Sequence, residues 1–351
     1  MDRLPEDAQT LHAETLALLL ALESERSWSH LSGSFATKSI KGIDYVYFQY
    51  SDPGGTKRQF SVGRRNAALD EIISEYGKRR DRHESDLVQV RRLAGLLRSA
   101  GLDSIPHGPA RVLGALADAG VFRLGGVLIG SYAFQALGNL LGVKWPAAAW
   151  RTQDVDVAAH LRIAVPKLDA DVPKTLESLQ MGFVPIPQLD PDHPSTSFRV
   201  RGQPLRVDLL TPGQGRDESP VYIPRFKAAA QPIPHLSIIL HEAQPAVAID
   251  GGATLVVVPS PARYALHKLF VSQTRSIPQQ SKAGKEMHQA ALLLEILAED
   301  RPTDLEQAAR AVAAAGPTVT SKISRALDVA LKRWPEVQPG ASIIRQGLSQ
   351  A

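Results

Sequence analysis

The sequence predicts an α+β protein in which helices and strands alternate through the middle of the chain and helices alone follow. Three observations predict this class. Short strand patterns follow a first helix near the N-terminus, helix and strand patterns alternate from about residue 107 to 260, and apolar residues recur at helical spacing after Pro259. The chain has 351 residues, of which 44% are hydrophobic, so it can bury a large core.

Leucines at helical spacing predict a first helix over residues 10–26. Alternating β-branched and aromatic residues predict two strands within residues 33–50, and a turn at 51–55 leads to a third strand over 57–62. These strands form a small antiparallel meander. A charged helix follows over residues 66–100.

This first region carries excess positive charge. Between residues 33 and 98 there are 13 Lys and Arg against 8 Asp and Glu, with dense basic runs at Lys78–Arg82 and Arg91–Arg92. Two interpretations stay open, namely a solvated helix face or a surface that contacts the phosphate backbone of a nucleic acid. In the second interpretation three aromatic residues would stack on bases: Tyr45, Tyr47 and Phe48.

The middle region alternates between the two element types, and the C-terminal region is helical. Predicted helices of the middle region cover residues 108–119 and 132–141. Predicted strands cover residues 122–129, 153–159, 197–200, 205–210 and 254–258, with a further short candidate at 221–223. The proline-rich stretches 185–194 and 212–224 are otherwise predicted loops. Later helices are predicted over residues 261–274, 281–298, 305–314 and 319–334. We therefore predict three domains, over residues 1–105, 106–260 and 261–351.

Composition and the N-terminal residues exclude several classes of protein. The chain has no cysteine, which excludes disulfides, thiolate metal sites and a cysteine nucleophile. Its net charge of +4 permits an anionic partner without requiring one. The first residues are mostly acidic, and the early apolar run Leu16–Leu22 is too short to span a bilayer. We therefore expect a cytoplasmic protein without a membrane partner.

A glycine–serine pair stands where a strand pattern meets a helix pattern. The apolar stretch Gly125–Ile129 ends in Gly130 and Ser131, and helical spacing begins at Tyr132. At such a junction, free backbone N–H groups and the helix dipole favour a phosphate group. Taken alone, the pair also fits an ordinary tight turn.

Three aspartates lie on the strands that follow. Asp154 and Asp156 alternate with Val155 and Val157, so both carboxylates share one face of a strand. Asp208 lies between apolar residues of a later strand, where an unpaired charge would be costly. A shared divalent cation would relieve both the repulsion and this cost, although a solvated edge strand is the alternative for the first pair.

The combination of Gly-Ser, Asp-x-Asp and a later lone Asp resembles the nucleotidyltransferase fold shared with polymerase β. It is similar to bacterial stand-alone nucleotidyltransferases related to the toxins of abortive-infection systems, in which a Thr-x-Asp-x-Asp strand occurs as at Thr152–Asp156. The resemblance covers about residues 108–300. It implies a polymerase-β-like mixed sheet with flanking helices, to which the residue patterns add a small N-terminal unit and a C-terminal helical domain.

The helical region extends the resemblance. Pro259–Leu269 resembles the family helix that brings a lysine near the nucleotide, here Lys268. Arg275, Lys282 and Lys285 precede a Glu-Met-His-Gln-Ala sequence, similar to a family pattern that has Asp where this chain has Glu286. The resemblance assigns nucleotide and phosphate binding to Gly130, Ser131, Lys268, Arg275, Lys282 and Lys285. The alternative for the four cations is an ordinary surface role.

The resemblance also implies a reaction. The family transfers a nucleoside monophosphate from a nucleoside triphosphate such as ATP to a hydroxyl group and releases pyrophosphate. Asp154 and Asp156 would hold two Mg²⁺ ions, with Mn²⁺ as a second candidate, and Asp208 would complete one site and accept the hydroxyl proton. All three aspartates are thus predicted as catalytic residues and as metal ligands.

The acceptor stays open between an RNA 3′ end such as that of tRNA, a protein side chain and a small molecule. The basic N-terminal region favours RNA, and a toxin-like role is implied by resemblance alone. The alternative from another class is a non-catalytic nucleic-acid-binding protein with the same fold. A degenerate copy is expected to lose a carboxylate, whereas this chain keeps all three.

Overall fold

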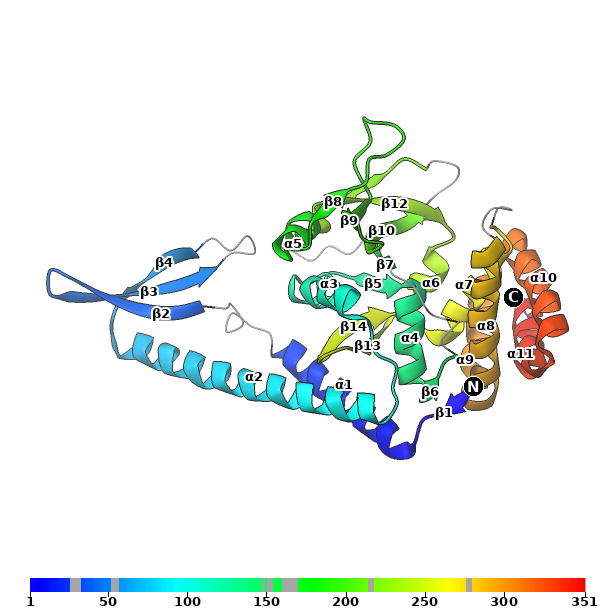
Figure 1. The fold of residues 1–351 in the computed structure, drawn as a ribbon, viewed down its shortest axis with the longest axis horizontal. Helices are drawn as coiled ribbons and strands as arrows, with labels where there is room; N and C mark the ends of the chain where they lie inside the picture. Colours follow the sequence, from blue (N-terminus) through cyan, green and yellow to red (C-terminus); the bar gives the residue numbers. More distant parts are fainter. Residues whose placement is uncertain are drawn as a thin grey trace.

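The computed structural model describes residues 1–25, 33–51, 57–146, 149, 154–159, 170–213, 218–275 and 280–350. The molecule is elongated (Figure 1). A small sheet and a long helix project from one side of a central body, and a group of helices forms the opposite end. A mixed sheet occurs together with many helices, which confirms the predicted α+β class.

The N-terminal elements include a projecting arm. Helix α1 (Glu6–Ser24) is followed by an antiparallel sheet in the order β2-β3-β4 and by helix α2. The arm, as we call these strands and α2 together, has the bounds β2 (Gly33–Ile40), β3 (Ile43–Ser51), β4 (Lys57–Arg64) and α2 (Ala67–Ser99). Asn66 begins α2 because its side chain accepts a hydrogen bond from the backbone N–H of Leu69.

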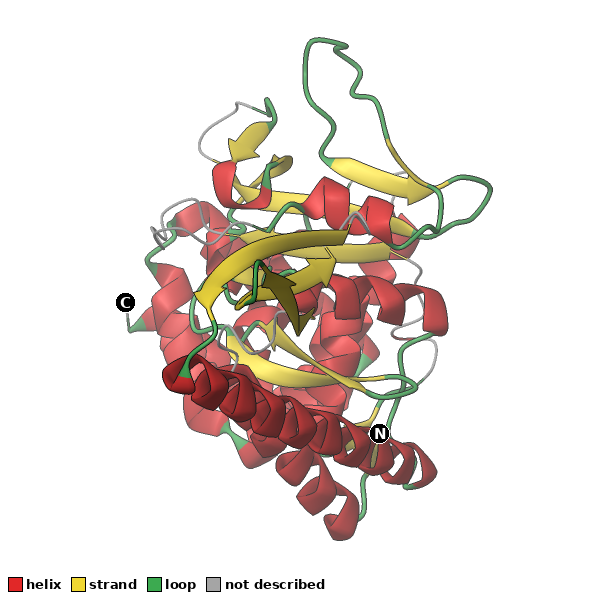
Figure 2. Cartoon of the chain, turned by 90° about the vertical axis from the view of Figure 1, so that its left-hand side faces the viewer, coloured by secondary structure: helices red, strands yellow, loops and turns green. Residues whose placement is uncertain are grey.

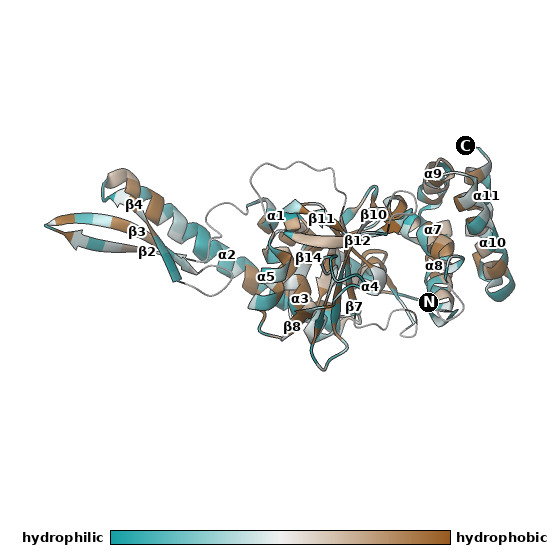
Figure 3. Cartoon of the chain, turned by 90° about the horizontal axis from the view of Figure 1, so that it is seen from above, coloured by the Kyte–Doolittle hydropathy of each residue, from teal (hydrophilic) through white to brown (hydrophobic). Residues whose placement is uncertain are grey.

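Helix α2 joins the arm to the body. Its 33 residues span about 50 Å. Near its C-terminus, Val90 and Leu97 are buried in a small core with α1 and the hairpin of β13 (Gln244–Ile249) and β14 (Ala253–Val258). Near its N-terminus, Tyr76 packs against the sheet of the arm. Figure 3 shows the helix between these contacts as largely hydrophilic.

The central body contains a seven-stranded mixed sheet. Its strand order is β11-β12-β10-β7-β5, with β9 also paired to β10 and β8 paired to β9. β10 runs parallel to β7 and β12, and the remaining pairs are antiparallel. The bounds are β5 (Gly126–Ile129), β7 (Asp154–Ala159), β8 (Phe183–Pro185), β9 (Ser197–Val200), β10 (Arg206–Gly213), β11 (Val221–Ile223) and β12 (Ala228–Pro234).

Helices and short strands flank this sheet (Figure 2). Helix α4 follows β5 directly and packs against both β5 and the β13–β14 hairpin. The remaining elements of the body are β1 (Asp2–Arg3), α3 (His107–Asp118), α4 (Gly130–Leu140), β6 (Val143–Lys144), α5 (Val172–Ser178), a 3₁₀ turn (Pro224–Phe226) and α6 (Ser237–Leu240).

The C-terminal helices share one continuous hydrophobic core with the central sheet. Helices α7 and α8 pack side by side, and α9 packs against α11. Proline occupies the first turn of α7, α9 and α10, where its missing N–H costs no helical hydrogen bond. The bounds are α7 (Pro261–Ser272), α8 (Gln280–Asp300), α9 (Pro302–Ala313), α10 (Pro317–Arg333), a 3₁₀ turn (Pro335–Val337) and α11 (Gln338–Ser349).

Several elements differ from the sequence predictions. The predicted strand over 122–129 is a strand only from Gly126, because the chain turns first and Gly125 has a φ of +84°. Strands β12 and β13 and helix α11 were not predicted, and the first helix begins at Glu6. The predicted strand start at Gln153, together with Thr152, lies outside the described residues.

None of the helices in the described ranges combines the length and the apolar character that crossing a membrane requires. Helix α2 is the longest of those described, and its exposed middle is rich in charged residues.

Candidate functional site

The nine predicted site residues line one cavity of about 690 Å³. The cavity lies where β5 meets α4, beside β7 and β10, and is closed on another side by α7 and α8. Residues that are far apart in the sequence are therefore neighbours in space. The nine are Gly130, Ser131, Asp154, Asp156, Asp208, Lys268, Arg275, Lys282 and Lys285.

The register between β7 and β10 sets the three aspartates next to one another. In this parallel pair, Asp156 lies opposite Asp208, and Asp154 lies opposite Arg206. The intervening Val155 is fully buried in the core, so strand alternation turns the aspartates to the cavity. The same alternation was the basis on which the sequence predicted a shared face.

Asp208 has partners that the sequence analysis did not foresee. Its Oδ1 accepts a hydrogen bond of 2.5 Å from Ser197 Oγ and one of 2.6 Å from Arg206 Nε. A second guanidinium nitrogen of Arg206 donates to Ser197 Oγ at 3.1 Å. The carboxylate of Asp208 is thus paired within the protein by Ser197 and Arg206, whereas the sequence analysis expected a shared cation to relieve its charge. Ser197 reaches it because β9 pairs with β10 so that these two residues lie opposite each other.

The remaining two carboxylates sit in a strongly anionic environment. Burial, together with the carboxylates of Asp208 and Asp154, raises the pKa of Asp156 to about 7. Burial and Asp208 also raise the pKa of Asp154. Negative charge is therefore costly at these two partly buried carboxylates, and a cation between them would stabilise it.

Gly130 and Ser131 form the first turn of α4. Gly130 has a φ of +71°, and a Cβ atom at this position would collide with Oδ2 of Asp156, so only glycine fits. The residue before the helix is Ile129, and within the described residues no side chain caps this terminus. The first N–H groups of α4, which carry the positive end of the helix dipole, are therefore available to an anion beside the aspartates.

Helices α7 and α8 hold this turn in place. The fully buried Tyr264 of α7 donates a hydrogen bond of 2.8 Å to the carbonyl oxygen of Gly130. The hydroxyl group also lies 3.3 Å from Oε1 of Gln289, which is a residue of α8. Gln289 in turn donates to the carbonyl oxygen of Ala149 at 2.7 Å. A buried chain of hydrogen bonds thus connects the helical end of the molecule to the glycine–serine turn.

A cationic wall faces the aspartates. Lys268 comes from α7, Lys282 and Lys285 come from α8, and Arg275 lies between the two helices. Burial lowers the pKa of Lys268 and that of Lys285. Cations that are partly stripped of water in this way interact more strongly with an anionic ligand than exposed ones do.

Glu286 anchors this wall. Its side chain is buried, and its two oxygens accept hydrogen bonds from Arg275, at 2.5 Å from one terminal guanidinium nitrogen and 3.2 Å from Nε. Lys268 Nζ lies 4.0 Å from the same carboxylate. The hydrogen bond that Arg275 donates to Glu286 raises the pKa of Arg275.

Sequence reasoning missed some of the residues around the cavity. Arg206 stands two positions before Asp208 on a strand, so alternation could have placed it on the same face. Glu286 was noted only as a departure from the family pattern, and no spacing pointed to the roles of Ser197 and Tyr264. Further cavity residues outside the predictions are His235, His267 and Lys322.

The donor set of the three aspartates consists of carboxylate oxygens, which suits Mg²⁺ or Mn²⁺. Burial and the neighbouring carboxylates, which together raise the pKa of Asp156, make its negative charge costly, and a cation at this position would stabilise it. In the described part of the chain, no three His, Asp or Glu side chains already form a metal-binding group, and the guanidinium of Arg206 supplies the positive charge next to Asp208. The assignment of the metal ligands therefore stays a prediction.

Residues 107–314 match the model of a protein family described as nucleotidyltransferase. The match covers more than half of the chain and includes the nine predicted site residues, so the chain belongs to this nucleotidyltransferase family. Membership implies a transferase that uses a nucleotide substrate. Searches of the curated proteins and of the solved structures found no match.

Proposed function

We propose that this protein transfers a nucleoside monophosphate from a nucleoside triphosphate to an acceptor hydroxyl group and releases pyrophosphate. The observation that carries this proposal is the single cavity in which three strand-borne carboxylates, an uncapped helix N-terminus and four cations meet. Each of these groups fits a different part of the substrates.

The triphosphate fits between α4 and the cationic wall. The first N–H groups of α4, at Gly130 and Ser131, are suited to phosphate oxygens. Lys268 and Arg275 would balance the negative charge that develops on the leaving pyrophosphate, and Lys282 and Lys285 add positive charge at the start of α8. Glu286 keeps Arg275 in place through two hydrogen bonds.

The aspartates fit the reacting end of the site. Asp154, Asp156 and Asp208 would hold two divalent cations, which would neutralise phosphate charge and lower the pKa of the acceptor hydroxyl. Ser197 and Arg206 fix the carboxylate of Asp208 next to Asp156.

In the proposed transfer reaction one bond to the α-phosphorus forms and one breaks. The acceptor oxygen forms a bond to the α-phosphorus, and the bond from the α-phosphorus to the oxygen that bridges to the β-phosphorus breaks. The electron pair of that bond leaves with pyrophosphate, and the hydroxyl proton passes to the carboxylate of Asp208. The enzyme needs no covalent intermediate for this exchange.

We also propose a polymerase-β-like arrangement of the sheet and the three-domain division 1–105, 106–260 and 261–351. An RNA 3′ end such as that of tRNA is the proposed acceptor, because the arm carries more cations than anions and lies apart from the cavity. A cytoplasmic location and the toxin-like role implied by the resemblance belong to the same hypothesis.

The proposal is tested with each of the four labelled nucleoside triphosphates, Mg²⁺ and total tRNA. We expect label transfer by the wild-type protein and none by Asp156→Asn or Asp208→Asn. Asp192→Asn, which changes an exposed loop aspartate outside the cavity, is the matched control and should transfer normally. Transfer that persists in the two cavity variants contradicts the assignment, and salt-sensitive tRNA binding by a wild-type protein that transfers no label supports the non-catalytic alternative.

A further inference from the structure

The sheet of the arm has two chemically different faces. Phe35 and Phe48 point toward α2, where their rings meet Tyr76 with centroid distances of 5.2 and 5.6 Å. Phe48 is only 3% exposed, so the prediction that it stacks on bases is wrong. Strand alternation places Tyr45 and Tyr47 on the opposite face, where both are half-buried.

Cations border these two tyrosines on both sides. Lys38 of β2 lies opposite Tyr45, and its Nζ sits 4.9 Å from the ring centroid of Tyr47. Arg64 of β4 lies opposite Tyr45 from the other side, and its side chain is exposed. We call this surface the tyrosine platform, defined by Lys38, Tyr45, Tyr47, Lys57 and Arg64.

Polar residues continue the platform toward the central body. Gln49 and Gln59 lie opposite each other on the same face, and their side-chain amides are within 3.4 Å. They help to line a hollow of about 420 Å³ together with Ser34 and Lys57. This end of the sheet faces the central body, whereas the turn between β2 and β3 forms the far tip of the arm (Figure 1).

We propose that the tyrosine platform binds a single-stranded nucleic acid. Aromatic rings on the open face of a sheet provide stacking surfaces for unpaired bases, and neighbouring lysines and arginines contact the phosphates. Bases of a duplex are already stacked and would not reach Tyr45 and Tyr47. A second copy of the same surface would bring Lys38 and Arg64 against like charges, so charge complementarity favours a polyanion over self-association.

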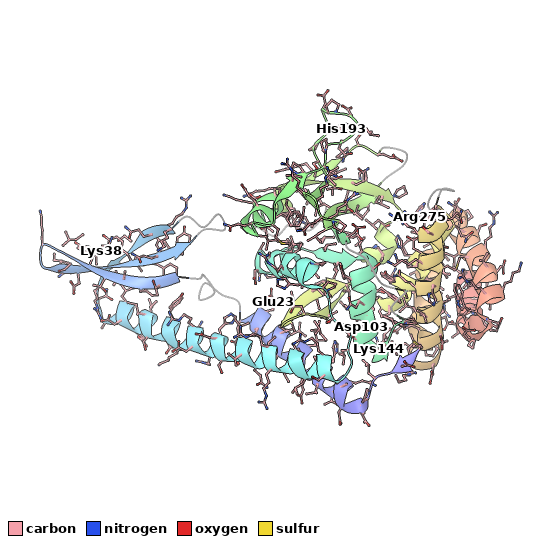
Figure 4. All side chains as sticks on the ribbon, in the orientation of Figure 1. Glu23, Lys38, Asp103, Lys144, His193 and Arg275 are labelled. Carbon is pink, nitrogen blue, oxygen red and sulfur yellow. The ribbon has the colours of Figure 1, made fainter. Side chains whose placement is uncertain are left out.

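The platform lies far from the cavity, so a substrate that reaches both must be long. Figure 4 labels Lys38 on the arm and Arg275 by the cavity, on opposite sides of the central body. The stretch of α2 from Tyr76, which packs on the sheet of the arm, to Val90, which is buried in the central body, spans about 20 Å. A small molecule could not contact both places, whereas a polynucleotide could. The identification of the bound strand as the acceptor rests on the proposed function, but binding itself does not.

Fluorescence anisotropy of the full-length chain tests the proposal without nucleotide or metal. The probes are a labelled single-stranded RNA, single-stranded DNA of the same sequence and the corresponding RNA duplex. We expect salt-sensitive binding of the single strands and weaker binding of the duplex. Equal binding of RNA and DNA supports recognition by stacking and phosphate contacts, and preference for RNA supports an added contact to the 2′-hydroxyl groups.

The double variant Tyr45→Ala/Tyr47→Ala should weaken single-strand binding about tenfold or more. Tyr45→Phe/Tyr47→Phe retains the rings and should bind nearly as well as the wild type. Tyr222→Ala, which removes an exposed tyrosine of β11 in the central body, is the matched control. Circular dichroism of each variant shows that it is folded.

Unchanged binding by the alanine double variant overturns the proposal, and so does a duplex that binds as tightly as the single strands. A wild-type protein that binds no probe but forms dimers that the alanine double variant disrupts also overturns it. The binding test and the transfer test are independent of each other. If Asp156→Asn loses label transfer but still binds RNA, the platform proposal is supported. Failure of the platform proposal can therefore be distinguished from failure of the proposed reaction.

Discussion

The hydroxyl group of Tyr264 donates a hydrogen bond of 2.8 Å to the carbonyl oxygen of Gly130, although 134 positions separate the two residues in the sequence. This bond ties α7 to the first turn of α4, whose N–H groups are directed at the proposed triphosphate site. The geometry of that turn therefore depends on how the C-terminal helices pack against the sheet.

Tyr264→Phe tests this connection. The substitution keeps the ring but leaves the carbonyl oxygen of Gly130 without this donor, which should lower the free energy of unfolding by about 1–2 kcal/mol. We also expect slower nucleotidyl transfer, because the phosphate-binding turn is less firmly held. Urea denaturation and the rate of label transfer measure the two effects. Tyr222→Phe is the control, and equal behaviour of both variants would show that the bond has no role.

Arg206 supplies a positive charge directly beside Asp208 and opposite Asp154. Arg206→Ala should therefore lower the melting temperature without metal, because three carboxylates then face one another with less compensation. Added Mg²⁺ should restore more stability in this variant than in the wild type, by about 2 °C or more in melting temperature. Thermal unfolding with and without Mg²⁺ measures the difference.

Asp156→Asn provides the comparison for that experiment. Removal of one carboxylate reduces the repulsion and also removes a proposed ligand, so the stabilisation by Mg²⁺ should be lost. Equal stabilisation of the wild type, Arg206→Ala and Asp156→Asn would mean that Mg²⁺ binds elsewhere. This readout does not depend on finding the acceptor.

The shared face of Asp154 and Asp156 could be predicted because alternation of polar and apolar residues with a period of two is visible in the sequence. Asp154 and Asp156 alternate with valines, and the structure turns them to the cavity as that pattern requires. Strand β12 could not be predicted in the same way. It begins with three alanines at Ala228–Ala230, which carry little strand propensity, and it is a strand because it pairs with both β10 and β11.

The contacts that support the site were harder to predict than the site residues. Arg206 could have been placed from its spacing to Asp208, since residues two apart on a strand share a face. Ser197 reaches Asp208 only through the antiparallel pairing of β9 with β10. The bond between Tyr264 and Gly130 depends on tertiary packing between distant segments, about which local periodicity gives no information.

Glu286 provides the next test because its buried carboxylate pairs with both Arg275 and Lys268. Glu286→Gln leaves two partly buried cations without their shared counterion, which should lower the free energy of unfolding by about 3 kcal/mol. We expect a higher KM for the nucleoside triphosphate, because Arg275 is no longer held, and a smaller change in kcat. Steady-state kinetics and urea denaturation measure these effects.

Glu299→Gln is the matched control for Glu286→Gln. It changes a glutamate on the same helix whose side chain is 74% exposed, so its ion pair with Arg3 should contribute little to stability. An unchanged KM in Glu286→Gln would show that the carboxylate stabilises the fold without positioning Arg275 for the nucleotide.

His12 makes the stability of the protein depend on pH at a place remote from the cavity. This histidine of α1 is buried, and its Nε2 has no hydrogen-bond partner among the described residues. Burial lowers its pKa from 6.5 to about 4. Between pH 6.5 and pH 4 the imidazole is therefore protonated in the unfolded chain but neutral in the folded chain. The free energy of unfolding is highest above pH 6.5 and decreases by about 3 kcal/mol as the pH falls toward 4.

Urea denaturation between pH 7.5 and pH 4.5 tests this dependence in wild-type and His12→Gln proteins. We expect the free energy of unfolding to fall less steeply with decreasing pH in the variant, because glutamine does not titrate. A residual slope should persist, since burial also lowers the pKa of His267 to about 3 and this group acts in the same direction. Parallel curves for the two proteins would show that the imidazole of His12 is accessible to protons in the folded state, contrary to its burial.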